Sequence, residues 1–252
     1  MKIYVLVNNR PDFIYLQYES LKRFCRDKFS LIILNNASNV LIRLIIRKTC
    51  KILKLPCVEV PFDNYPNANI ACGVPLQWAY EKLIYPSCGI NVILDSDMFL
   101  INPIKFEEYV NGYEIAGVSQ IRGDVNYLWN GILVFNNPRS PELINLLPGN
   151  INSNPVDVGG LLYYWMSKIK PSIRYIKHSS HIKQDNNNLT ELPKSILKEY
   201  REEYNFEIYD RIFLHYSRGS NWRREGYSYH RQKSKLIHQF VNGRISGNVV
   251  FN

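Results

Sequence analysis

Cysteine is scarce in this chain of 252 residues, and its five cysteines are odd in number and show no C-x-x-C spacing. A zinc site and a disulfide framework are therefore not expected, and a reducing compartment is favoured. Long apolar runs are also absent. The first run gives way to Asn8-Asn9-Arg10-Pro11, and no later run has the length of a membrane span. These absences predict a cytoplasmic protein without an integral membrane segment.

Acidic residues are in the minority, since 22 Asp and Glu stand against 31 Lys and Arg, a net charge of +9. Such an excess implies an anionic partner, which nucleic acid, anionic lipid or a phosphorylated substrate would satisfy. The sequence shows no helix-turn-helix, zinc-finger or RNP-type pattern, and its positive charge is dispersed. We therefore expect no nucleic-acid partner, and a basic nucleic-acid-binding protein is the least favoured interpretation of the chain.

Apolar segments alternate with segments of helical period in the first half of the chain. Strands are predicted at 2–7, 30–34, 57–60 and 90–94, and helices at 11–25, 40–55 and 73–84. This alternation predicts an α/β fold with a mixed, mostly parallel sheet between helices. The second half is less regular, with strands expected at 114–118, 132–135, 174–177 and 211–216 and helices from 159 and at 228–241. One domain is expected over 1–252, with a nucleotide-binding half (1–103) and an acceptor-binding half (104–252).

The predicted helix 40–55 carries a basic stripe and an apolar stripe. The basic residues are Arg43, Arg47, Lys51 and Lys54, and the apolar residues include Leu41, Leu44, Ile45 and Ile52. The basic stripe is interpreted as a solvent-exposed face rather than a membrane anchor, and the Leu and Ile residues are expected to pack on the sheet. Peripheral contact with a membrane surface stays open.

Two carboxylates, Asp95 and Asp97, end the buried strand 90–94 abruptly. Charges at such a place are costly unless something pairs with them, and carboxylate oxygens suit Mg²⁺ or Mn²⁺ held together with substrate phosphates. The first two strands also end in polar residues, Asn8 and Asn9 in one case and Asn35 and Asn36 in the other. Ligands of a doubly wound sheet bind beyond the carboxyl ends of its strands, so three strands are expected to bring these groups to one edge.

The segment ILDSDMFLINP resembles the D-x-D signature of metal-dependent, nucleotide-sugar glycosyltransferases of the GT-A fold. Other segments resemble that family in the same order over roughly residues 2–222, namely IYVLVNNRPDFIYLQYESLKRF, LIILNNAS, LWNGILVFNN, VDVGGLLYYW and FLHYSRGSNW. The last is similar to the His-containing motif of the glycogenin-like branch. The resemblance implies transfer of a sugar from a nucleotide sugar, with a UDP-sugar favoured, to a hydroxyl of a glycan, protein or small-molecule acceptor.

The resemblance also implies roles for particular residues. Asp95, Asp97 and His215 would hold Mn²⁺ or Mg²⁺, although His215 considered without the resemblance is better interpreted as a core histidine satisfied by the backbone. The donor-binding residues implied are Val7, Asn8, Arg10, Asn35, Asn36, Ser96 and Asn130. Where the glycogenin-like pattern has Lys-Pro-Trp, this chain has other residues, so contact with the diphosphate falls to Arg218, Arg223 or Arg224. Trp129 is either ordinary core or a sugar-stacking residue.

Asp157 is the candidate for the acceptor side, since it lies before Gly159 and Gly160, where a ligand can approach the backbone closely. In an inverting enzyme it would be the general base, and in a retaining enzyme it would position the substrates; the motifs leave the stereochemistry open. Asp124 is the second candidate base or a turn residue. A nucleotidyltransferase of sugar phosphates is the alternative function. It is expected to carry a Gly-rich phosphate loop after its first strand, whereas this chain has no glycine before Gly73.

Overall fold

A computed structural model describes residues 1–61, 65, 67–182, 206–217 and 222–241 of the chain. The chain divides into two compact units. Unit 1 comprises Met1–Pro11, Asp27–Asp95 and Lys105–Ile176, and unit 2 comprises Asp12–Arg26, Ser96–Ile104 and Lys177–Asn252. The prediction of a single domain over 1–252 stays a prediction.

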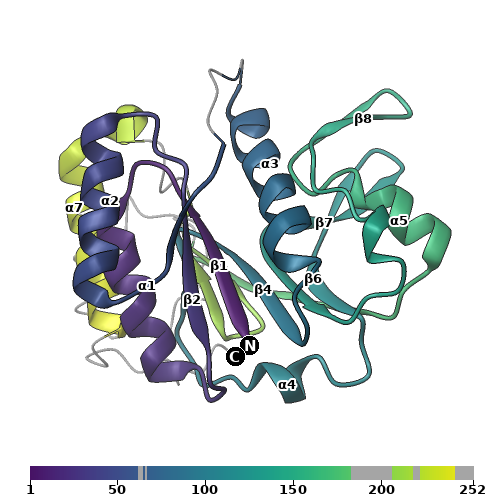
Figure 1. Ribbon diagram of the computed structural model, residues 1–252, viewed down its shortest axis with the longest axis horizontal. Coiled ribbons are helices and arrows are strands. Elements are labelled where there is room, and N and C mark those ends of the chain that lie inside the picture. The colour runs from purple at the N-terminus through teal and green to yellow at the C-terminus, as the bar shows by residue number, and fades with distance from the viewer. Residues whose placement is uncertain (62–64, 66, 183–205, 218–221, 242–252) are drawn as a thin grey trace. The chain divides into compact units, whose positions relative to one another are not determined.

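A seven-stranded sheet forms the centre of unit 1, in the order β10-β6-β7-β4-β1-β2-β3 (Figure 1). Its strands are β1 (Lys2–Val7), β2 (Ser30–Asn35), β3 (Cys57–Glu59), β4 (Ile90–Asp95), β6 (Ile115–Arg122), β7 (Val125–Asn136) and β10 (Ile173–Tyr175). All neighbouring pairs are parallel except those that β7 makes with β4 and β6. The predicted mixed, mostly parallel sheet is confirmed.

The central strands are apolar because both of their faces are buried. On β1, Ile3 and Val5 are fully buried on one face, and Tyr4 and Leu6 join the core on the other. Helices α3 and α5 cover that second face (Figure 1). The remaining elements of unit 1 are α2 (Val40–Leu53), α3 (Ala68–Ala79), its π-helical continuation η1 (Tyr80–Ile84), α4 (Phe106–Tyr109), η2 (Pro141–Leu143), β8 (Gly149–Ile151), β9 (Asn154–Val156) and α5 (Leu162–Ile169).

The prediction for helix 40–55 was right about the helix and about its basic stripe, of which Arg47, Lys51 and Lys54 are exposed, and wrong about its apolar residues. Only Ile46 and Cys50 of α2 are buried. The side chains expected to pack on the sheet are exposed instead: Leu41 (69%), Leu44 (51%), Ile45 (46%) and Ile52 (68%). Two members of the basic stripe turn toward the sheet edge, where Arg43 and Arg47 form ion pairs with Glu59 of β3. The helix thus packs through a narrow face beside these ion pairs and leaves its apolar stripe outside.

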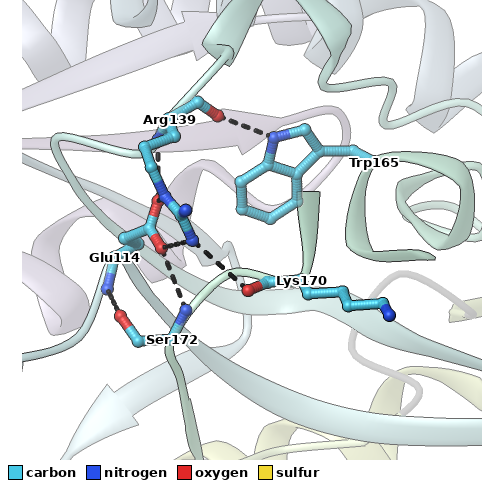
Figure 2. Close-up of polar contacts among 5 residues, drawn as sticks. All are labelled: Glu114, Arg139, Trp165, Lys170 and Ser172. Atoms are coloured by element: carbon cyan, nitrogen blue, oxygen red, sulfur yellow. Dashed lines mark hydrogen bonds and ion pairs between the residues drawn. The ribbon is translucent and has the colours of Figure 1, made fainter. Parts of the chain in front are cut away.

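A cluster around Glu114 joins the end of β7 to the turn before β10 (Figure 2). The Arg139 guanidinium donates to both carboxylate oxygens at 3.0 and 2.8 Å, and the backbone N–H of Ser172 donates at 3.0 Å. Arg139 also receives a hydrogen bond from Trp165 Nε1 on its carbonyl oxygen. The hydrogen bonds from Arg139 outweigh the opposing effect of burial and lower the pKa of Glu114 to about 2.

Replacement of Glu114 by glutamine is expected to destabilise the fold by about 2 kcal/mol at pH 7. Because the pKa of Glu114 is lower in the folded than in the unfolded chain, its contribution is fully present above pH about 4.5 and is lost as the pH falls toward about 2. Urea denaturation at pH 7 and pH 3 should therefore show a smaller difference between wild type and variant at pH 3.

The control for Glu114→Gln is Glu108→Gln, which breaks an exposed ion pair with Lys105. That variant should leave the free energy of unfolding close to that of the wild type, because exposed ion pairs contribute little. An equal effect of the two variants would contradict the assignment of Glu114 as a structural clamp.

A four-stranded antiparallel sheet in the order β11-β12-β13-β5 forms the centre of unit 2. Its strands are β5 (Met98–Leu100), β11 (His178–Ile182), β12 (Phe206–Tyr209) and β13 (Phe213–His215), with helices α1 (Pro11–Phe24) and α7 (Trp222–Val241). Helix α1 lies along β5, since Gln17 and Ser20 donate to the carbonyl oxygens of Met98 and Leu100. These contacts hold the segment that follows the D-x-D motif in a fixed position within unit 2.

Candidate functional site

The carboxyl ends of three parallel strands are neighbours in unit 1. Val7 at the end of β1 is in register with Asn35 of β2, and Leu6 is in register with Asp95 at the end of β4. Asp95 is partly buried. The structure therefore brings the strand ends that carry the predicted polar residues to one edge of the sheet, as the alternation of elements predicts.

The two asparagines after β2 differ in what their side chains do. Asn35 is fully buried, donates to Glu59 at 2.9 Å and to the Arg43 carbonyl oxygen, and accepts from the N–H of Ala37. Asn36 is 4% exposed and donates to the carbonyl oxygen of Ala71 at 3.0 Å. The Oδ1 atom of Asn36 is buried without a hydrogen-bond partner. A buried acceptor without a donor is costly, so Asn36 is the better candidate to meet a ligand, while Asn35 has a structural role.

Asn130 lies at an irregularity in β7. The register between β6 and β7 shifts after Gly117, so residues 130–132 bulge from the ladder with β6, although Ile132 still pairs with Leu94 of β4; such bulges are found next to many active sites. Asn130 is 5% exposed, and its amide donates to Sγ of Cys72 at 3.9 Å. Gly159 packs against this strand with a φ of 87°, and a Cβ there would collide with the carbonyl oxygen of Leu128. A side chain at position 159 would therefore displace the strand that carries Asn130.

Asp157 follows β9 and accepts hydrogen bonds from three side chains. Asn69 donates at 2.9 Å, Gln120 at 3.2 Å and Arg122 at 2.8 Å, the last as an ion pair. The Asp157 side chain is 38% exposed, so a ligand can still reach it. The structure thus places an accessible carboxylate beside the end of β6, at the edge where β4 also ends.

Asp124, the other acid named by the sequence, lies in the turn between β6 and β7. Its two oxygens accept from the amides of Asn152 at 3.0 Å and Asn154 at 2.7 Å, in and next to the β8–β9 turn. Gly123 precedes it with a φ of 60°. This environment favours the turn role over that of a base.

The start of α3 connects three of the predicted residues. Asn69, Ala71 and Cys72 contact Asp157, Asn36 and Asn130, respectively. Asn67 caps the helix by accepting from the N–H of Ile70. Sequence reasoning placed this helix at 73–84 and so missed its first turn, although Asn67 before an apolar segment is an N-cap signal.

In unit 2, His215 lies between two carboxylates. Its Nε2 atom is 3.4 Å from Oδ1 of Asp97, and its Nδ1 atom is 2.7 Å from Oε2 of Glu207. The side chains of His215 and Asp97 are only 12% and 10% exposed. Burial lowers the pKa of His215, but the attraction and hydrogen bonds of the two carboxylates outweigh it and raise this pKa to about 10. The interpretation of His215 as a plain core histidine fits this charged environment poorly.

Sequence reasoning missed Glu207. The hairpin register places it directly opposite His215, since β12 and β13 pair Glu207 with His215. The alternation Phe206-Glu207-Ile208, followed by a second short apolar segment, was the available signal. A histidine that binds a metal through one ring nitrogen commonly donates a hydrogen bond from the other to a carboxylate, which fixes the orientation of the ring.

Across the described residues, no three His, Cys, Asp or Glu side chains converge as a metal-binding group requires. The two carboxylates near His215 do not converge, because Asp97 contacts one ring nitrogen and Glu207 contacts the other. With the Nε2 proton lost, His215 and Asp97 nevertheless form a pair close to what a cation requires: ligands about 2.1 Å from one metal lie about 3.0 Å apart at an octahedral ion and about 3.4 Å apart at a tetrahedral one, and the observed separation is 3.4 Å. The Asp97 carboxylate suits Mn²⁺ or Mg²⁺ held together with phosphate, and a neutral imidazole is a common metal ligand.

The other predicted residues are placed as follows. Val7 is fully buried and Arg10 is 1% exposed, whereas Asn8 is exposed. Ser96 is 7% exposed. The half-buried Trp129 packs its ring over Gly131. Arg218 lies outside the described residues, and so do the side chains of Arg223 and Arg224 at the start of α7.

No protein-family model matches the chain, and no curated protein matches it. Solved structures similar to it include the galactosyltransferase LgtC with donor and acceptor sugar analogs (10% identity, TM-score 0.37), over 54% of this chain and 58% of that one. The mannosyltransferase PcManGT from Pyrobaculum calidifontis with GDP-Man and Mn²⁺ has 13% identity and a TM-score of 0.44, over 69% and 53% of the two chains. Mouse xyloside xylosyltransferase 1 has 10% identity and a TM-score of 0.43, over 69% and 85%.

These neighbours are glycosyltransferases. The chain spans little more than half the length of the first two, and all three TM-scores lie below 0.5. None of the helices in the described part of the chain has the length and apolar composition that crossing a membrane requires.

Proposed function

We propose that this chain transfers a sugar from a nucleotide-sugar donor to a hydroxyl acceptor with the help of Mn²⁺ or Mg²⁺. The observation that carries the proposal is the buried pair of Asp97 and His215, whose facing atoms are 3.4 Å apart, with Glu207 behind the ring. Asp95, two residues before Asp97, is the further ligand that the sequence predicts. A cation held there would stabilise the negative charge that develops on the leaving diphosphate.

In this proposal the residues of the chain orient the metal ligands and select the base of the nucleotide. Glu207 accepts from Nδ1 of His215 and so aims Nε2 at Asp97. Asn36 offers its unpartnered Oδ1 to the imide N–H of a base, a donor that uracil has and cytosine lacks. Asp157 serves the acceptor side, as base or as positioning residue. Arg218, Arg223 and Arg224 stay candidates for contact with the diphosphate.

UDP together with Mn²⁺ is expected to raise the melting temperature of the protein more than UDP alone or Mn²⁺ alone, since a ligand stabilises the fold that it binds. CDP with Mn²⁺ should give a smaller shift, because N3 of cytosine carries no hydrogen to donate to Asn36, and the amino group of cytosine lies at a different position on the ring. Asn36→Leu should reduce the UDP shift, while Asn36→Asp, which keeps an acceptor, should retain more of it. Equal shifts with CDP and UDP would overturn the role of Asn36.

A panel of nucleotide sugars, assayed for hydrolysis with and without Mn²⁺, tests the reaction itself. Release of UDP from one sugar donor, dependent on the metal, is the expected result. Formation of a UDP-sugar and pyrophosphate from UTP and a sugar phosphate would instead identify a nucleotidyltransferase.

A further inference from the structure

Helix α2 carries a concentration of exposed apolar side chains. Twelve large apolar or aromatic side chains are exposed among the described residues, and five of them lie on this helix: Val40, Leu41, Leu44, Ile45 and Ile52. Single exposed apolar residues are ordinary, but a cluster of five on one element marks an interaction surface. We call these five residues the α2 apolar face.

The α2 apolar face is continuous and basic. At about 100° per residue its five side chains cover roughly 140° of the helix circumference. Lys48 and Lys51 project within the same arc, and both are exposed. Between Val40 and Val58 the sequence has five basic residues and no acidic one. Arg43 and Arg47 lie at the edge of the arc, where Glu59 pairs with them.

We propose that the α2 apolar face, with Lys48 and Lys51, binds the surface of a membrane that contains anionic lipid. The helix would lie in the plane of the interface, with its Leu and Ile side chains among the acyl chains and the lysine ammonium groups at the level of the lipid phosphates. The membrane-binding proposal uses none of the residues assigned to the chemistry, so it stands whether or not the proposed function holds.

The position of the lysines favours lipid over a protein partner. Lysine is depleted from the cores of protein interfaces, which are instead enriched in aromatic residues and arginine. The arc on α2 has lysines inside it and no aromatic side chain. At a membrane, by contrast, a long lysine side chain adds apolar contact along its stem and attraction to anionic headgroups at its end.

Co-sedimentation with vesicles tests this proposal. The protein should bind vesicles of phosphatidylcholine and phosphatidylglycerol far better than vesicles of phosphatidylcholine alone, and high salt should weaken the binding. Lys48→Ala/Lys51→Ala should lower the partition coefficient on anionic vesicles about 30-fold. Leu44→Gln/Ile45→Gln should lower it about tenfold or more.

Matched controls remove similar side chains elsewhere. Ile121→Gln/Leu143→Gln removes two exposed aliphatic residues, and Lys82→Ala/Lys168→Ala removes two exposed lysines; both should bind as wild type. Thermal melts verify that each variant is folded, and Leu41→Gln/Ile52→Gln replaces the Leu44/Ile45 variant if that one is not.

Equal binding to the two kinds of vesicle, or equal loss in the controls, overturns the proposal. So does a dimer in sedimentation velocity that Leu44→Gln/Ile45→Gln dissociates while vesicle binding is absent.

Discussion

Asp97→Ala is expected to abolish the metal-dependent part of UDP binding and to lower the hydrolysis of a UDP-sugar by about 10²-fold or more, the scale of losing one stabiliser of transition-state charge. The carboxylate contacts His215 Nε2, so its removal takes away one of the two facing groups that fit a cation. The backbone carbonyl of Asp97 accepts from the N–H of Tyr216 and is retained in the variant. We therefore expect a folded protein that no longer responds to Mn²⁺.

Two further variants separate a metal site from a structural ion pair. His215→Ala removes the second facing group and should lose the Mn²⁺ response as Asp97→Ala does. Glu207→Gln still offers a hydrogen bond to the ring and should weaken the response to Mn²⁺ about tenfold, as a change behind a ligand usually does. Calorimetric titration of Mn²⁺ in the presence of UDP measures all three.

The control for Asp97→Ala is Asp210→Ala, which removes a carboxylate that accepts from the backbone N–H of Lys177 in the same unit. Its Mn²⁺ response should equal that of the wild type. If Asp97→Ala melts far lower than the wild type but keeps full metal-dependent UDP binding, then Asp97, His215 and Glu207 form a structural network of two ion pairs and the proposed metal site fails.

The strands of unit 1 were predictable because their sequence pattern and their environment agree. The run that forms β4 is largely apolar, with Asn91 its one polar residue before Asp95, as expected of a strand buried on both faces. The apolar residues of helix α2 were misjudged because periodicity does not say which of them face the core, and only Ile46 and Cys50 are buried. The ion pairs of Arg43 and Arg47 with Glu59 were not predictable either, because Glu59 belongs to another element whose position the sequence alone does not give.

At the candidate site, too, the sequence predicted residue types but not their partners. Asp97 and His215 were identified by resemblance to a family motif, and the structure brings them within 3.4 Å of each other. The partners of these residues were not predictable. Glu207 reaches His215 through strand register, and the roles of Asn35 and Asn36 differ because only Asn35 has all its polar atoms satisfied by its own chain. Residue type suggests chemistry, whereas hydrogen-bond partners depend on tertiary contacts.

Asp157→Asn is expected to lower sugar transfer about 10²-fold while leaving the affinity for UDP nearly unchanged. The amide keeps the shape of the side chain but removes its charge and its basicity, and positioned bases contribute about 10²- to 10⁴-fold. A split between transfer rate and donor affinity is what the loss of an acceptor-side group produces. Rates and calorimetric affinities measured on the same preparations show whether the split occurs.

Arg122→Gln decides what Asp157 does. The Arg122 guanidinium occupies Oδ2 of Asp157 at 2.8 Å, and Gln120 donates to the same oxygen at 3.2 Å. If Asp157 accepts the proton of the acceptor, loss of Arg122 leaves that oxygen with one donor fewer, and transfer should be retained or increased. If the ion pair only holds the segment after β9 in place, Arg122→Gln and Asp157→Asn should lower transfer alike. Full transfer activity in Asp157→Asn would exclude both roles, and Asp124, held by Asn152 and Asn154, would then be the acid to replace.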